Sequence, residues 1–179
     1  MKKFLVLAVG ATFFPALGFA QSSTAITGPA QGDRELMLAA NGSSDADFDN
    51  NRLNISASFA HFFTDAVSLG LRQDIHWIDL DNQDSVLRGA TDVFGHWHFG
   101  DVGATVRPFL GLNIGYFYGD QLTDTWVAGP ELGAKWYVQP RTFVLTQIDY
   151  QVTFTDADEF DENWDDGRFR YQVGVGYNF

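Results

Sequence analysis

Three residues in the first half of the chain, Asp74, His76 and Ser85, are of the types that carry out acyl transfer. A hydroxyl nucleophile needs a histidine base, and the histidine needs a carboxylate to orient it. Asp74 and His76 are two positions apart and would share one face of a strand, and Ser85 follows in a turn-rich segment. An acid next to a histidine is also common on polar faces that have no catalytic role. We therefore expect no catalytic residues.

Two further histidines, His96 and His98, have a spacing at which one strand face can bind zinc. A tetrahedral site needs further ligands, and no third one is evident nearby. We expect ordinary polar packing for both rings, no metal site and no cofactor.

Carboxylates gather in segments rich in turn residues. One run is Asp45-x-Asp47-x-Asp49, and the densest spans 156–166. Ca²⁺ and Mg²⁺ prefer carboxylate oxygens, which makes divalent cations candidate partners. The first run lacks the glycine and the terminal glutamate of an EF-hand, and charge runs are usually solvated surface. We expect acidic surface segments.

The overall charge limits the classes of partner. The formal net charge of the 179 residues is −12, whereas a nucleic-acid surface needs clustered lysine and arginine. No nucleic-acid partner is expected. The chain has no cysteine, so disulfides do not support the fold.

The N-terminal residues predict export. Met1, Lys2 and Lys3 form a basic region, residues 4–17 are apolar, and Gly18 and Ala20 suit cleavage. We expect a signal peptide over 1–20, a short periplasmic lead over 21–32 and one folded domain over 33–179. The apolar run is too short for a spanning helix, and no longer one follows, so a membrane crossing would need strands.

The segment 168–179 shows which strands these are. Its polar residues and glycines alternate with apolar residues, which are Phe169, Tyr171, Val173, Val175, Tyr177 and Phe179. Similar alternation recurs at 34–41, 52–63, 67–78, 88–99, 107–118, 126–138, 142–154 and 168–179. Each segment has the roughly 9–11 residues that a tilted strand needs to cross a bilayer. The irregular positions are Pro130, which predicts a bulge or local irregularity, and Gln73, which is polar on the apolar face.

Most charged residues of these segments fall on the polar face. They are Arg52, Arg72, Asp74, Arg88, Asp92, Arg107, Glu131, Lys135, Asp149, Arg168 and Arg170, together with Glu35. A charge facing lipid costs about 2–4 kcal/mol at the midplane. A soluble sandwich would turn its apolar residues inward instead. The pattern predicts an all-β, closed, eight-stranded antiparallel transmembrane barrel with these charges in its lumen, where Glu131, Asp149, Asp92 and Arg170 have similar depths.

Connection lengths predict the orientation. Short breaks alternate with longer acidic ones, and outer-membrane barrels have short periplasmic turns and longer external loops. The first strand would run outward, and the last would end at the periplasmic rim.

The closing residues Gln172, Gly174, Tyr177 and Phe179 match the C-terminal pattern of a polar residue, a glycine and two aromatics that the outer-membrane assembly machinery reads. With the strand pattern over 33–179, the chain resembles the small eight-stranded barrels of the OmpA/OmpX type. The resemblance implies an integral protein of the bacterial outer membrane, in contact with lipid, lipopolysaccharide and that machinery. We expect a monomer.

A porin-like barrel of this size can have several roles. We expect a non-enzymatic protein that contributes to envelope integrity and presents acidic loops for surface interaction, because eight strands leave a lumen that side chains just fill. The alternatives are a lipid A-modifying enzyme using Asp74, His76 and Ser85, and a narrow channel. Nothing around these residues resembles the His-x-Ser motif of the deacylases.

Overall fold

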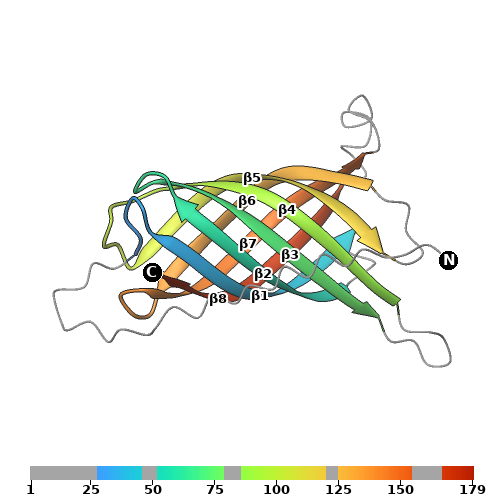
Figure 1. The fold of residues 1–179 in the computed structure, drawn as a ribbon, viewed down its shortest axis with the longest axis horizontal. Helices are drawn as coiled ribbons and strands as arrows, with labels where there is room; N and C mark the ends of the chain where they lie inside the picture. The colour runs from blue at the N-terminus through green and yellow to red at the C-terminus, as the bar shows by residue number, and fades with distance from the viewer. Residues whose placement is uncertain (1–27, 46–51, 79–85, 120–124, 155–166) are drawn as a thin grey trace.

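The computed structural model describes residues 28–45, 52–78, 86–119, 125–154 and 167–179. They form one closed antiparallel barrel in which each strand pairs with its neighbours in sequence and the last strand pairs with the first (Figure 1). The strands are β1 (Arg34–Asp45), β2 (Arg52–Phe62), β3 (Val67–Ile78), β4 (Val86–His98), β5 (Val106–Gly119), β6 (Thr125–Tyr137), β7 (Thr142–Phe154) and β8 (Arg168–Asn178).

The predicted fold class is confirmed, and the strand bounds differ from the expected ones by a few residues. The largest difference is in β1, which continues to Asp45 because it pairs with strands on both sides, up to Asp45 opposite Arg168 of β8. The predicted signal peptide, residues 21–27 of the predicted lead and the densest acidic run lie outside the described residues. So do Ser85 and the side chains of His76 and Arg52.

The barrel is apolar outside and polar inside. Leu112, on the outer face of β5, is 69% exposed, whereas Arg72, on the inner face of β3, is 1% exposed. The same alternation appears along β8, where Val173 and Val175 are exposed and Gln172 is buried. Such a wall suits a hydrocarbon surrounding rather than water.

Two of the outer irregularities have a physical explanation. The Gln73 side chain is fully engaged on the outer wall: its Nε2 donates to the Ala90 carbonyl at 2.9 Å and to the Tyr118 hydroxyl at 2.8 Å. Thr91 Oγ1 donates to Gln73 Oε1 at 2.7 Å. At Pro130 the β6–β7 ladder is interrupted between the pairs Ala128–Val152 and Glu131–Asp149, and the register is the same on both sides. The irregularity is therefore a gap in the ladder and not a bulge.

The strand β7 departs from strict alternation beyond that gap. Gln151 and Val152 are both buried, and Thr153 is exposed. Strict alternation along β7 would place Val152 on the outer face with Tyr150, but its side chain is buried.

Short turns at 63–66, 99–105 and 138–141 lie at one end of the barrel, together with the start of β1 and the end of β8 (Figure 1). We call it the turn end and the opposite one the loop end. The pair Arg34–Phe179 closes the barrel at the turn end through two backbone hydrogen bonds of 2.9 Å.

The segment 28–33 packs at the turn end. The Gly28 amide donates to the Pro140 carbonyl at 3.1 Å, and the Gly32 amide donates to the Phe62 carbonyl at 2.8 Å. Gly28 has a φ of 90° and lies against Arg107 and Tyr137, a place in which a side chain would be strained and crowded.

Within the described residues, no helix is long and apolar enough to span a membrane.

Candidate functional site in the barrel interior

The strand register places charged residues of five strands at one level of the lumen. Arg72 lies opposite Asp92 across β3 and β4, and Asp149 lies opposite Arg170 across β7 and β8. Glu131 and Asp149 are also direct cross-strand partners, although both are acidic. Like charges in this position repel, so they need cations from the opposite wall.

Arg170 supplies one such cation. Its Nε donates to Asp149 at 2.8 Å, and its Nη1 donates to Asp74 at 2.6 Å and to Asp92 at 3.0 Å. Its Nη2 lies 3.7 Å from Glu131. One guanidinium from β8 thus reaches carboxylates on four other strands.

Arg72 supplies the second cation and spans the lumen from β3 to β6. Its Nη1 donates to Glu131 Oε1 at 2.8 Å and lies 3.6 Å from Asp92. The Phe94 ring lies under the guanidinium, at 4.7 Å from its centroid. Planar guanidinium groups favour such stacking on an aromatic face combined with a carboxylate contact.

The central cluster also includes His96 and Asn113. His96 Nε2 is 2.5 Å from Glu131 Oε2, and Asn113 Nδ2 donates to Glu131 Oε1 at 3.0 Å. Glu131 is therefore held by groups from β3, β4 and β5. Hereafter, the central cluster is Arg72, Asp74, Asp92, His96, Asn113, Glu131, Asp149 and Arg170. Its charged members are all buried.

A second, smaller group of charges lies nearer the turn end. The Lys135 ammonium donates to both carboxylate oxygens of Glu35 at 2.7 Å. Asn178 donates to the same carboxylate at 3.0 Å. Three rings also surround the ammonium, those of Phe62, Phe109 and Phe143 at 5.2, 5.7 and 5.1 Å. Cation–π contacts and a paired carboxylate together make a buried ammonium tolerable.

Arg107 joins the wall to the segment at the turn end. Its Nη1 donates to the Pro29 carbonyl at 2.9 Å, and its Nη2 donates to the Asp65 carbonyl. It is almost completely buried, and it does not join the central cluster. Arg88 is partly buried and Arg168 is exposed at the loop end.

Asp74 was a candidate for acyl transfer, and His96 and His98 were candidates for zinc binding. Asp74 accepts a hydrogen bond from Arg170, so its carboxylate belongs to the central cluster. His96 contacts Glu131, and His98 Nδ1 lies 3.2 Å from the Ala66 carbonyl. Among the described residues, no three histidine, aspartate or glutamate side chains are arranged to hold a metal ion.

The residues of the predicted assembly signal divide between the two faces of β8. Gln172 faces the lumen and donates to Ser56 at 2.8 Å, and Gly174 lies against Ala39. Tyr177 and Phe179 face outward at the turn end, with ring centroids 6.5 Å apart.

Solved structures share this architecture. The N-terminal barrel domain of Pseudomonas aeruginosa OprF superposes with a TM-score of 0.62 at 21% identity, and covers 84% of this chain and 100% of that one. The chain has the fold of a small outer-membrane barrel. Neisserial surface protein A matches with a TM-score of 0.60 at 14% identity, over 84% of this chain and 99% of its own. For OprG of P. aeruginosa the values are 0.58 and 16%, over 85% and 98%.

No protein-family model matches the sequence, and no curated protein matches it. The similarity to these solved structures confirms the expected resemblance to small outer-membrane barrels at the level of the fold. The apolar outer wall of the barrel agrees with an integral position in that membrane.

Three contacts of this interior are not evident from the sequence. They join His96, a zinc candidate by its spacing, to Glu131, Lys135 to Glu35, and Asn113 to Glu131. Alternation placed all of them on the inner face, but alternation carries no information about which side chains meet across a lumen.

Proposed function

We propose that this protein is a non-enzymatic outer-membrane barrel that supports envelope integrity and presents acidic loops at the cell surface. The observation that carries the proposal is that, among the described residues, side chains occupy the lumen from the central cluster to the turn end. Side chains of the central cluster reach from wall to wall, and apolar residues pack between it and the turn end, among them Phe109, Phe143 and Leu145. A barrel with such an interior is better suited to holding external loops rigidly than to conducting solutes.

The turn end would face the periplasm and the loop end the cell exterior, as in barrels with short periplasmic turns. The connections at the loop end carry the acidic runs of the sequence. Divalent cations could bridge these carboxylates to lipopolysaccharide phosphates, since such ions prefer oxygen ligands. We propose the barrel as a monomer in contact with lipid and lipopolysaccharide, inserted by the assembly machinery.

The role can be tested in a strain that lacks the protein. We expect faster uptake of a hydrophobic dye and greater sensitivity to detergent, both restored by the wild-type chain. A matched variant in which Asp156, Asp158 and Asp161 become asparagine keeps the barrel and removes loop charge. We expect it to restore the barrier only partly. A deletion strain with an unchanged barrier would contradict the proposal.

The two alternatives need separate assays. In planar bilayers we expect no discrete conductance steps, with a large porin as the positive control; reproducible steps would favour a channel. On labelled lipid A we expect no turnover. Turnover that disappears in Ser85→Ala and His76→Ala variants would establish the enzyme instead.

A further inference from the structure

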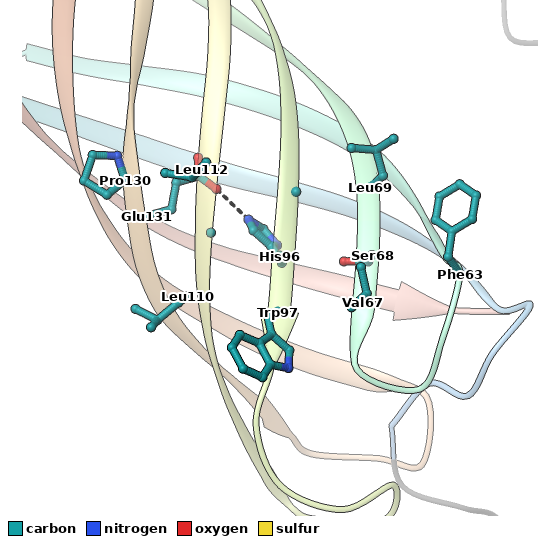
Figure 2. Close-up of a pocket in the computed structure, with 12 residues that line it drawn as sticks. Phe63, Val67, Ser68, Leu69, His96, Trp97, Leu110, Leu112, Pro130 and Glu131 are labelled. Atoms are coloured by element: carbon teal, nitrogen blue, oxygen red, sulfur yellow. Dashed lines mark hydrogen bonds and ion pairs between the residues drawn. The ribbon is translucent and has the colours of Figure 1, made fainter.

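The outer wall of the barrel contains an apolar groove over β3 to β6, close to the turn end (Figure 2). Its volume is about 770 Å³. We call it the outer groove. The outward residues that line it include Phe63, Leu69, Gly95, Trp97 and Leu112.

The groove exists because Gly95 occupies an outward position of β4. The register places Gly95 between Leu69 of β3 and Leu112 of β5, and a Cβ atom at Gly95 would come no nearer than 3.8 Å to any neighbour. Gly89 is the other outward glycine in the described part of β4, and the ring of Tyr118 covers it. The space at Gly95 stays open, with Trp97 at its turn-end side.

The groove faces the hydrocarbon of a bilayer, so the occupant that fits its lining is a lipid acyl chain. Lipid tails are as apolar as leucine, which means that burial alone gives no preference. A preference among lipids must come from close packing along the groove and from the headgroup at its end.

The charge near the turn end selects the headgroup. Two turns border the groove: 63–66, which begins with the lining residue Phe63, and 99–105, which joins β4 to β5. Asp65 and Asp101 are exposed on these turns, and neither turn contains lysine or arginine. Carboxylates attract an ammonium and repel a headgroup that carries only negative charge.

We infer that the outer groove holds one acyl chain of a phospholipid with an ethanolamine headgroup, whose ammonium lies beside Asp65 and Asp101. This inference rests on the placement of the barrel in a membrane with its turn end at the periplasmic leaflet. It does not depend on the role proposed for the acidic loops.

Native mass spectrometry of the barrel released from mixed micelles tests the inference. The probes are phosphatidylethanolamine and phosphatidylglycerol with identical acyl chains, supplied in equal amounts. We expect the ethanolamine lipid to be retained several-fold more often than the glycerol lipid. Equal retention of the two lipids by the wild-type barrel would overturn the inference.

Two kinds of variant separate the chain from the headgroup. Gly95→Leu fills the groove, and we expect it to lose most retained lipid of either type, whereas Ala57→Leu, at an exposed outward site on β2, keeps it. The double variant Asp65→Asn and Asp101→Asn should retain lipid but lose the preference. Heat-modifiable gel mobility verifies folding, and Gly95→Ala, which should lose an intermediate amount, replaces a Gly95→Leu chain that fails to fold.

Three further outcomes also test the inference. Gly95→Leu retention equal to that of the Ala57→Leu control would overturn the assignment to the groove. A dimer that Gly95→Leu abolishes would assign the groove to a second copy of the chain and overturn the inference as well. The barrel could retain ethanolamine lipid while the strain that lacks the barrel keeps an intact envelope barrier. That result would support the inference and contradict the proposed function.

Discussion

Replacement of Arg170 by methionine tests the central cluster most severely. The guanidinium lies within 2.6 to 3.0 Å of Asp74, Asp92 and Asp149, and removal of one partner of a buried ion pair costs about 3–5 kcal/mol. Glu131 keeps Arg72 and His96, whereas Asp149 keeps a 3.3 Å hydrogen bond from the amide of Gln147. Because these partners remain, we expect the free energy of unfolding to fall by about 3–5 kcal/mol, the range for removing one partner of a buried ion pair.

The assay is urea unfolding of the barrel in lipid vesicles, followed by the fluorescence of its five tryptophans. Arg168→Met is the matched control, because Arg168 lies on the same strand but is exposed. Exposed charges contribute little, so its effect should be well under half of the loss at Arg170.

A second replacement distinguishes ion pairing from packing. Asp149→Asn in the Arg170→Met background removes one carboxylate that has lost its cation, and it should restore part of the stability. The stabilising role of the Arg170 ion pairs would be refuted if Arg170→Met changed the unfolding free energy no more than Arg168→Met, or if Asp149→Asn destabilised both backgrounds equally.

Other predictions concern packing, the second charge group and assembly. Gly176→Ala should destabilise by about 1–3 kcal/mol because a Cβ there collides with the ring of Phe143, whereas Gly95→Ala should be nearly neutral; equal urea midpoints would contradict this. Lys135→Met should destabilise by about 3–5 kcal/mol, and neutralising its partner carboxylate as well should recover much of the loss; a double-mutant cycle without coupling would refute the pairing. Phe179→Ala should lower the folded fraction in the outer membrane several-fold and leave refolding in detergent unchanged, as read by heat-modifiable mobility. Equal folded fractions in cells would remove the assembly role from this residue.

Most of the fold could be predicted from the sequence because a strand with one face toward lipid and the other toward the lumen has a regularly alternating sequence. Each residue of β8 either contacts the surroundings or the lumen, so the alternation of Val173 and Val175 with Gln172 and Gly174 gives both the strand and the face on which each side chain lies. Strand order followed from length, since short connections join sequential antiparallel neighbours.

The contacts inside the lumen were harder to predict. Cross-strand neighbours such as Asp149 and Arg170 follow from the register, but the link from Arg72 to Glu131 crosses the barrel and depends on strand tilt and side-chain reach. The same limit explains His96, whose nearest partner along the chain is His98 but whose partner in space is Glu131. The outer groove depends on one glycine, and the sequence does not show that Gly89 is covered while Gly95 is open.

The barrel should place the apolar face of its strands against lipid and enclose the charged face. The chain has no cysteine, so single cysteines at the exposed outward positions Leu112 and Val175 can carry nitroxide labels without a background signal. In bilayers we expect both labels to relax by collision with oxygen dissolved in lipid and to be shielded from a water-soluble nickel chelate. Labels that meet the nickel chelate more readily than oxygen would place these faces in water and contradict the account.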